Sequence, residues 1–438
     1  MFYDRITKFY TLRFFLKILL LFMFLVSQLW SMNLYKKGDS NENTMFLLSG
    51  IHGNERGAYL AACLVVTKYD IQKGSVWVIP NINMPSIIEN KRGINGDMNR
   101  KFHKISEFDK DYQIVSRLKN FIAQDNINFL LNLHDGSGFY RPTVINSTYA
   151  PYRWGQSIVI DQKNMNHEFG NLYEISQNII NNINQNIYNS KHHFRTKNTK
   201  TNMGNASMSK SLSWFALNNN KPSITSETSF ELDVITRVKH HLMVIEATMN
   251  ELGIEYSRDF NLDNDEIKEV LYSGLDIVIE DVLLSLDGVK PVIKNVPLVS
   301  KTPKYKSSNP LISLREMDNV YNVLYGNEIL TSIEPEYRDK SLTNMPVFVN
   351  IDNEFREFVH MPSVVNVKSH FSIEDSRYYR INVIGYVNNY EDETNIDIYR
   401  SNFIQDYAID QNRNTYRVEV YDKRDDSFVG MFLIKYEE

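Results

Sequence analysis

Apolar strand-like runs alternate with helix-like segments from about residue 44 to residue 250, and this alternation most constrains the fold. The strand-like runs are "TMFLLSG", "SVWVIPNINM", "INFLLNLHDGSG" and "PSITSETS". The helix-like segments are "GAYLAACLVVTKY", "DYQIVSRLKNFIAQDN", "LYEISQNIINNINQNIY", "LSWFALNN" and "VITRVKHHLMVIEATMNEL". The pattern predicts an α/β domain on a mixed, mostly parallel sheet.

The character of the sequence changes after about residue 253. A short helical segment, "DEIKEVLYSG", leads into short alternating runs separated by turn residues, and from about residue 340 the pattern is purely strand-like. A chain of 438 residues is too long for one ordinary core. We therefore predict a domain over residues 32–252, a small β-rich domain over 253–339 and an immunoglobulin-like β-sandwich over 340–438.

The first 31 residues have the composition of a secretory signal. Four basic residues precede the apolar run "ILLLFMFLV": Arg5, Lys8, Arg13 and Lys17. The alternative is a membrane anchor, but polar residues interrupt the stretch from Ile18 to Met32, and a spanning helix needs about 20 apolar residues. We expect cleavage near Met32 and a mature protein in the periplasm.

Composition excludes some classes of function. The net charge of −5 lacks the basic excess typical of nucleic-acid binding. The single cysteine, Cys63, lies in the apolar stretch "AYLAACLVV" and cannot form an internal disulfide. We expect it to be a buried structural residue.

Three metal-ligand residue types follow two of the predicted strands. His52 and Glu55 stand three residues apart in "LSGIHGNERG", and His134 follows the apolar run in "LLNLHDGSG". Sites in open α/β sheets form outside the carboxyl ends of the strands, so these side chains are expected to meet there. Two histidines and one glutamate form a known catalytic zinc set, which leaves a fourth position to water. A His-x-x-Glu pair is common by chance in loops, so this pair alone is weak.

Two further segments carry polar residues suited to hydrolysis. Arg92, Asn99 and Arg100 lie in the loop "KRGINGDMNRKF", where guanidinium groups would bind a carboxylate or a developing oxyanion. The alternative is a solvated basic loop. Glu227, in "KPSITSETS", is a candidate general base beside a zinc-activated water, and Glu231 is its rival.

Taken in order, "HGNE", "GDMNRKF", "NLHDGSG" and "PSITSETS" resemble the zinc carboxypeptidase family of carboxypeptidase A type. The resemblance implies that His52, Glu55 and His134 bind one Zn²⁺ and that Glu227 is the general base for attack of zinc-bound water on the peptide carbonyl. It also implies that Arg92 polarises the scissile carbonyl, and that Asn99 and Arg100 hold the substrate's terminal carboxylate. It implies a substrate-binding tyrosine as well, for which Tyr140 is a candidate.

The whole chain resembles the periplasmic D,L-carboxypeptidases that determine helical cell shape. Those enzymes trim peptidoglycan tripeptide side chains to dipeptides and release meso-diaminopimelate. Some of these relatives carry glutamine as the first metal ligand, where this chain has His52. The resemblance implies muropeptides as substrates, and wall or scaffold proteins as candidate partners of the β domains.

Two alternatives remain open. "GIHGNERG" also resembles the amidohydrolase branch of the same fold, which deacylates N-acyl amino acids. A non-catalytic wall-binding protein is the other. Of the remaining segments, we expect the loop "YAPYRWGQS" around Trp154 to pack on its own aromatic residues, with a place at the pocket entrance as the alternative, and His192 and His193 to lie in a polar surface loop.

Overall fold

The computed structural model describes residues 32–39, 43–205, 207–343, 345–387 and 393–437. In them the chain forms two compact units, which divide between Ile267 and Lys268. The predicted signal segment, residues 1–31, lies outside the described residues. No helix in the described part of the chain combines the length and the apolar character that a membrane span needs.

A mixed seven-stranded sheet forms the centre of the first unit, in the order β1-β4-β2-β5-β10-β8-β9. Strands β4, β2, β5 and β10 run parallel, whereas β1 is antiparallel to β4, β8 is antiparallel to β10, and β9 is parallel to β8. The predicted mixed, mostly parallel sheet is therefore confirmed. The strands are β1 Tyr35–Gly38, β2 Thr44–Leu48, β4 Ser75–Ile79, β5 Phe129–Gly136, β8 Ser157–Ile160, β9 Arg195–Asn198 and β10 Ser223–Ser229.

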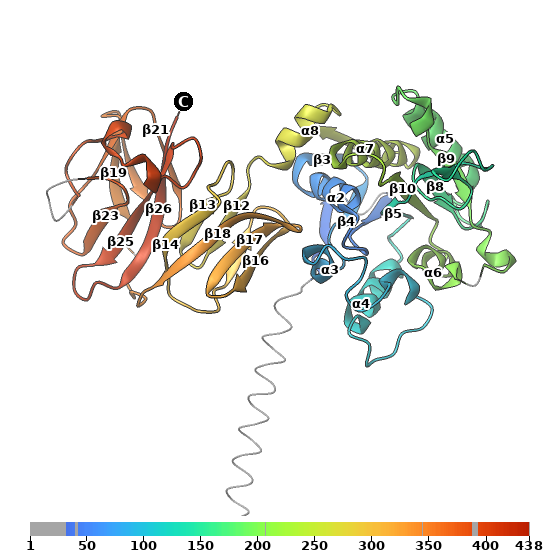
Figure 1. Cartoon of the computed structure of the whole chain (residues 1–438), viewed down its shortest axis with the longest axis horizontal. Helices are drawn as coiled ribbons and strands as arrows, with labels where there is room; N and C mark the ends of the chain where they lie inside the picture. The colour runs from blue at the N-terminus through green and yellow to red at the C-terminus, as the bar shows by residue number, and fades with distance from the viewer. Residues whose placement is uncertain (1–31, 40–42, 206, 344, 388–392, 438) are drawn as a thin grey trace, which may run out of the picture. The chain divides into compact units, whose positions relative to one another are not determined.

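Helices cover both faces of this sheet (Figure 1). One face is covered by α2 Arg56–Lys68, α5 Leu172–Asn184 and α7 Val234–Glu251, and the other by α4 Tyr112–Ile122 and α6 Leu212–Asn218. The other two α-helices in the described residues are short: α3 Met84–Ile88 lies within this unit, and α8 Asn264–Leu271 lies at its end. Smaller elements are β3 Tyr69–Lys73 paired with β11 Glu255–Arg258, β6 Phe139–Tyr140 paired with β7 Tyr149–Ala150, and the 3₁₀ turns η1 Met98–Arg100, η2 Ser190–His192, η3 Thr201–Met203 and η4 Met208–Lys210.

The central strands are buried on both sides because helices lie over both faces. In β2, Phe46 and Leu48 point into a core shared with α4 and α6, so the pleat turns Met45 and Leu47 toward the opposite face. Cys63, on α2, is buried as predicted.

The second unit is built from strands. Its first part contains the sheets β13-β12-β15 and β14-β18-β17-β16, and its last part contains β20-β19-β22-β24 and β21-β26-β25-β23. The strands of the first part are β12 Asp276–Ile279, β13 Val282–Ser285, β14 Val292–Leu298, β15 Tyr305–Ser307, β16 Ile312–Met317, β17 Val320–Tyr325 and β18 Glu328–Tyr337. Those of the last part are β19 Val347–Ile351, β20 Phe355–Val359, β21 Val364–Val367, β22 His370–Ile373, β23 Tyr379–Val383, β24 Ile398–Tyr399, β25 Thr415–Asp422 and β26 Phe428–Tyr436, with 3₁₀ turns η5 Arg400–Asn402 and η6 Gln405–Tyr407.

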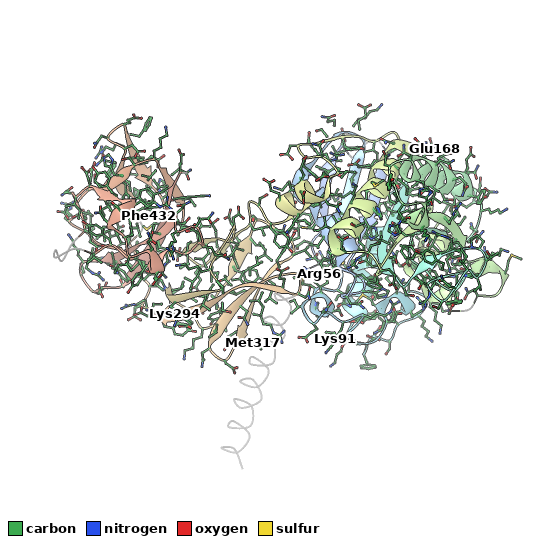
Figure 2. The ribbon with its side chains drawn as sticks, turned by 45° about the horizontal axis from the view of Figure 1, so that its top comes forward. Arg56, Lys91, Glu168, Lys294, Met317 and Phe432 are labelled. Carbon is green, nitrogen blue, oxygen red and sulfur yellow. The ribbon has the colours of Figure 1, made fainter. Side chains whose placement is uncertain are left out.

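The last two sheets enclose one apolar core and so form the predicted β-sandwich. Val349 of β19 and Phe371 of β22 come from one sheet, and Val418 of β25 and Phe432 of β26 come from the other. Figure 2 labels Phe432 in this last part of the chain. Along β19, buried residues alternate with less buried ones, as expected for a sheet with one buried face.

Candidate active site

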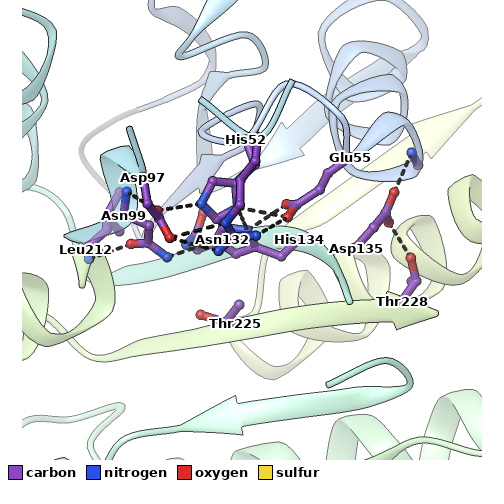
Figure 3. A network of polar contacts seen from close by, with 12 residues as sticks. His52, Glu55, Asp97, Asn99, Asn132, His134, Asp135, Leu212, Thr225 and Thr228 are labelled. Atoms are coloured by element: carbon purple, nitrogen blue, oxygen red, sulfur yellow. Dashed lines mark hydrogen bonds and ion pairs between the residues drawn. The ribbon is translucent and has the colours of Figure 1, made fainter. Parts of the chain in front are cut away.

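Three metal-ligand side chains meet at the carboxyl edge of the central sheet (Figure 3). His52 and Glu55 come from the loop between β2 and α2, and His134 comes from β5. Their ligand atoms lie within 4.8 Å of one another, and all three residues are buried. His52 Nδ1 is 2.8 Å from Glu55 Oε1 and 3.1 Å from His134 Nδ1, while His134 Nδ1 is 2.7 Å from Glu55 Oε2. Both imidazoles therefore present the same type of nitrogen to one point.

Two glycines allow the loop after β2 to reach this position, each for a different reason. Gly50 has a φ of +72°, a left-handed backbone conformation that side chains disfavour. Gly53 passes so close to the short helix α3 that a Cβ would meet the carbonyl carbon of Ser86 at 1.9 Å. Gly50 is therefore required for its backbone conformation, and Gly53 for close approach.

The charges of the site favour a cation at this point. Burial lowers the pKa of His52, but the carboxylates of Glu55 and Asp97 outweigh it and raise this pKa to about 9. Burial raises the pKa of Glu55, yet the two histidines hold it well below its usual range. Burial lowers the pKa of His134, which keeps that imidazole neutral. One positive charge beside Glu55 is thus stabilised, and a divalent cation can replace the proton that His52 would otherwise carry. The donor set fits a metal ion.

Asp97 contacts the second ring nitrogen of His52, and it is not among the site residues predicted from the sequence. Its Oδ1 lies 2.9 Å from His52 Nε2, which assigns the ring proton to Nε2 and leaves the Nδ1 lone pair facing Glu55. The same Oδ1 accepts a hydrogen bond of 2.9 Å from the backbone N–H of Asn99. Asp97 therefore ties the loop that carries Asn99 to the metal-ligand set.

Asn132 occupies the corresponding place behind His134. Its Nδ2 is 2.9 Å from His134 Nε2, and its buried Oδ1 has no hydrogen-bond partner in the described chain. A neutral imidazole that presents the Nδ1 lone pair to a metal carries its proton on Nε2, and that proton needs an acceptor. Turning the amide over would supply Oδ1 as this acceptor and would satisfy both groups.

The loop residues predicted to bind substrate lie beside this set. Arg92, whose side chain is half exposed, has Nη1 3.4 Å from Glu55 Oε1 and Nη2 3.1 Å from Asp97 Oδ2. Asn99 reaches His134, with Nδ2 3.4 Å from Nε2. Arg100 donates to the carbonyl of Asn99 at 3.0 Å, and among the described residues it forms no ion pair with a carboxylate. Its guanidinium thus retains the capacity to bind an incoming carboxylate.

Glu227 lies next to His134 on the adjacent parallel strand. The register of β10 and β5 pairs Glu227 with His134, so both residues lie inside strands, whereas the sequence placed His134 just after one and Glu227 at the end of one. Within the described residues, the Glu227 carboxylate has no hydrogen bond or ion pair. Burial and the charge of Glu55 raise its pKa to about 8. The rival, Glu231, is exposed on the surface.

Gly136 makes room for this carboxylate. A Cβ at position 136 would lie 2.7 Å from Glu227 Oε2 and 2.6 Å from Trp154 Cβ. Both contacts are shorter than real Cβ contacts, so a larger residue would displace the Glu227 carboxylate or the Trp154 loop.

A small pocket opens beside Glu227, and Trp154 and Met208 form part of its wall. Trp154 therefore lines the pocket, the position given as the alternative to a loop that packs on its own aromatic residues. Lys197 fastens this loop: its Nζ donates to the carbonyls of Pro151 at 2.7 Å and Arg153 at 2.8 Å, and it lies 4.3 Å from the centre of the Trp154 ring. Burial lowers the pKa of Lys197 to about 8.

Other aromatic candidates lie outside this pocket. The ring centre of Tyr140 is 4.5 Å from Lys197 Nζ, and Tyr140 is not among the described residues that line the pocket. His192 is half buried and stacks on Phe139 with 5.3 Å between ring centres. His193 Nε2 bonds to the carbonyl of Ile187 at 2.9 Å. The three grouped metal-ligand residues in the described chain are His52, Glu55 and His134, and neither His192 nor His193 belongs to them.

Comparisons with known proteins agree with this geometry. A family model described as "Carboxypeptidase controlling helical cell shape catalytic" matches residues 10–272, and one described as "C-terminal domain of metallo-carboxypeptidase" matches residues 339–437. Among solved structures, apo cell shape determinant protein Csd4 from Helicobacter pylori is 32% identical with a TM-score of 0.85, covering 93% of this chain and 100% of that chain. A tripeptide-bound structure of Csd4 gives the same values. An mDAP-bound form of Helicobacter pylori Csd4, described as a D,L-carboxypeptidase, is 31% identical with a TM-score of 0.85 and covers 92% and 100%. The search of curated proteins gave no match.

Proposed function

The chain belongs to the family of carboxypeptidases that control helical cell shape, and on that premise we propose that it is a zinc-dependent peptidoglycan D,L-carboxypeptidase. Its substrate would be the tripeptide side chain of peptidoglycan, from which it releases meso-diaminopimelate and leaves a dipeptide. The tripeptide- and mDAP-bound structures of Csd4 support this choice of substrate. The outcome in the cell would be a change of cell shape.

One observation carries the proposal: a buried set of metal ligands lies beside a partly buried carboxylate that has no partner of its own among the described residues. The ligand atoms of His52, Glu55 and His134 converge within 4.8 Å. Glu227 is paired with His134 across two parallel strands. A metal-ligand set used only for structure has no need of a neighbouring free carboxylate, whereas amide hydrolysis needs one to move protons.

His52, Glu55 and His134 would hold the zinc ion, with Asp97 orienting His52. When bound, zinc acts as a Lewis acid that polarises the scissile carbonyl and makes water more acidic. Two neutral imidazoles and one carboxylate suit this ion, because three protein ligands on a four-coordinate Zn²⁺ leave one position open.

Glu227 would take a proton from the attacking water and deliver it to the leaving amine. A pKa of about 8 lies close to the working pH, which suits a group that first accepts and then donates a proton. A cation at the three ligands would lower this pKa by attraction and so favour the ionised base. Arg92 would stabilise the oxyanion, while Asn99 and Arg100 would bind the terminal carboxylate of the substrate.

We also propose that the protein acts in the periplasm after removal of the segment 1–31. The basic start and the short apolar run support this location. The strand-rich second unit, of which residues 339–437 match a metallo-carboxypeptidase C-terminal domain, would bind wall or scaffold proteins.

Mass analysis of a synthetic tripeptide, L-Ala-γ-D-Glu-meso-diaminopimelate, before and after incubation with the purified protein tests the proposal. The expected result is release of free diaminopimelate, loss of activity on chelation and recovery on adding Zn²⁺. Glu227→Gln should retain zinc and lose roughly 100- to 10,000-fold in kcat, the range of general acid–base catalysis.

Glu231→Gln is the matched control, because it makes the same change on an exposed glutamate four residues further along the chain, past the end of β10. It should hydrolyse the tripeptide at the rate of the unchanged protein. Normal activity in Glu227→Gln would transfer the role of base to another group. Activity only on N-acyl amino acids would favour the amidohydrolase, and zinc-independent binding without hydrolysis would favour a wall-binding protein.

A further inference from the structure

A group of buried polar residues lies on the face of the sheet that α7 covers, and the mechanism above does not use it. Its centre is Asp135, which directly follows His134 on β5 and is 2% exposed. Helix α7 contributes Arg237 and His241, which are 7% and 0% exposed. A buried charge is costly unless it is paired and hydrogen-bonded, so its position directly beside a metal ligand calls for a physical reason.

The carboxylate of Asp135 is fully used within the protein. Its Oδ2 accepts a hydrogen bond of 2.9 Å from the backbone N–H of Gly57 and forms an ion pair with Arg237 Nη1. Its Oδ1 accepts a hydrogen bond of 2.5 Å from the hydroxyl of Thr228 (Figure 3) and lies 3.0 Å from His241 Nε2. A carboxylate offers about four acceptor positions, and these four groups occupy them. The contacts of Asp135 therefore serve the protein itself and leave no position for a ligand.

These contacts join the three segments that carry the candidate site. Gly57, Asp135 and Thr228 each follow a metal ligand or the proposed base by one or two residues along the chain. The segments also approach closely, since a Cβ at position 57 would lie 2.6 Å from Arg237 Cβ and 2.9 Å from Asp135 Oδ1. The spacing between α2, α7 and β5 is thus fixed at this point by close packing as well as by hydrogen bonds.

His241 contacts strand β10 on both sides of Glu227. Its Nδ1 lies 3.1 Å from Ser226 Oγ, and its Nε2 lies 3.0 Å from Thr228 Oγ1. With the ring proton on Nε2, the imidazole donates to Asp135 and accepts from the hydroxyl of Ser226, which satisfies both ring nitrogens. One buried ring on α7 therefore fixes the two chain neighbours of the proposed base.

Glu227 itself points to the other face of the sheet. Side chains alternate along a strand, so Ser226 and Thr228 face α7 while Glu227 lines the pocket on the opposite face. Because no described residue forms a hydrogen bond or ion pair with the Glu227 carboxylate, its place depends on the backbone that carries it. The register of β10 and β5 pairs Thr228 with Asp135 in the row directly after Glu227 and His134. The hydrogen bond between the former pair thus acts on the backbone that positions the latter.

We propose that Asp135, Thr228 and His241 are positioning residues that keep the Glu227 carboxylate at its working distance from the metal-ligand set. They act on β10 from the face opposite the pocket, and none of them is among the described residues that line it. This inference rests on the proposed carboxypeptidase function and adds to it the residues that fix the base. A shift of a reacting group by about 1 Å can cost about 100-fold in rate, so contacts with both neighbours of the base have a large effect.

Thr228→Val tests the proposal, because valine has the shape of threonine but lacks the hydroxyl. On the tripeptide L-Ala-γ-D-Glu-meso-diaminopimelate, the zinc-loaded variant should show a kcat about 10- to 100-fold lower, with KM and zinc content unchanged. Thr228→Ser restores the hydroxyl and should restore kcat. The matched control is Thr248→Val, which removes an equally buried hydroxyl that donates to the carbonyl of Val244 within α7 at 2.7 Å. This control should keep the kcat of the unchanged protein.

A double-mutant cycle separates the positioning of Glu227 from a general structural role. In Glu227→Gln the base is already absent, so the addition of Thr228→Val should lower kcat no further. An equal additional loss in that background would overturn the inference, because the hydroxyl would then act through another part of the site. Loss of zinc from Thr228→Val would also overturn it, because the effect would then fall on His134.

Unchanged kcat in Thr228→Val would overturn the inference and leave the proposed function standing. If the unchanged protein does not cleave the tripeptide, the proposed function fails and the inference fails with it. Should Thr228→Val not fold, Ser226→Ala decides, since it removes only the hydroxyl that contacts His241 Nδ1. We expect it to lower kcat in the unchanged protein and not in the Glu227→Gln background, and an unchanged kcat would overturn the inference.

Discussion

Asp97 offers a sharp test of the metal site, because one of its oxygens lies against the second ring nitrogen of His52 while the other lies against Arg92. Its Oδ1 is 2.9 Å from His52 Nε2 and its Oδ2 is 3.1 Å from Arg92 Nη2. Asparagine at this position can still accept the His52 proton but carries no charge, whereas alanine removes the acceptor as well. The two variants therefore separate the contribution of the charge from that of the hydrogen bond.

The expected magnitudes follow from the strengths of the two kinds of hydrogen bond. A bond to a charged group contributes about 1.5–3 kcal/mol and a neutral one about 0.5–1.5 kcal/mol. Asp97→Asn should thus weaken Zn²⁺ binding by about tenfold, and Asp97→Ala by roughly 10- to 100-fold. The effect should appear in the Kd for the metal, before any effect on substrate.

Competition with a chromophoric chelator measures this Kd at one fixed pH. Asp109→Asn is the matched control, since Asp109 pairs with Lys101 at 2.8 Å and makes no contact with His52. It should bind Zn²⁺ like the unchanged protein. Unchanged affinity in both Asp97 variants would refute the assigned role, and so would an equal loss in the Asp109 control, which would indicate general loosening.

Two further outcomes follow from the structure. Gly136→Ala should lower kcat by about 100-fold with zinc retained, because the new Cβ would lie 2.7 Å from Glu227 Oε2; normal turnover with normal zinc content would contradict the crowding argument. His240 is buried and its pKa is lowered by burial to about 3, so the unfolded chain binds more protons than the folded one between that pH and about 6.5. The free energy of unfolding should therefore fall by up to about 1.4 kcal/mol per pH unit as the pH drops below 6.5. Urea titrations should show a shallower fall in His240→Gln than in the unchanged protein. Identical slopes in the two proteins would show that His240 binds protons equally in the folded and unfolded states.

The grouping of the three metal-ligand residues could be anticipated, because apolar runs locate the strands and sites form at the carboxyl ends of parallel strands. His52, Glu55 and His134 follow or end apolar runs, and parallel neighbours bring such ends to one edge. The order of the motifs then indicated Glu227, which the register places opposite His134. Hydrophobic periodicity did not locate the ends of β5 and β10, since both strands continue past their apolar residues into polar ones.

Asp97 was missed although it lies two residues before Asn99 in a segment already singled out. An aspartate in a glycine-containing loop is usually solvated, and only the fold brings it within 2.9 Å of His52. Its signal was the pattern of an acidic residue beside two predicted substrate-binding residues. A histidine ligand needs an acceptor for its second nitrogen, and this chemical requirement could have prompted a search for one.

A place for Trp154 at the pocket was only the alternative prediction, because local sequence patterns did not favour it. The polar strand β9 lacks apolar alternation. Trp154 joins the pocket because Lys197, from that same strand, holds its loop. Interactions between such distant segments are set by the tertiary fold, which sequence periodicity does not describe.

The pairing of Glu227 with His134 has a consequence for how the site loses activity. Neighbouring strands lie about 4.8 Å apart and are joined by backbone hydrogen bonds on both sides of this pair. Glu227 and His134 can separate only when the middle of the sheet opens, and such central strands exchange their amide hydrogens through the rarest openings of a protein. Thermal fluctuation of surface loops would admit or exclude substrate while leaving this pair in place, so heat should inactivate the centre in one step together with the melting of the sheet.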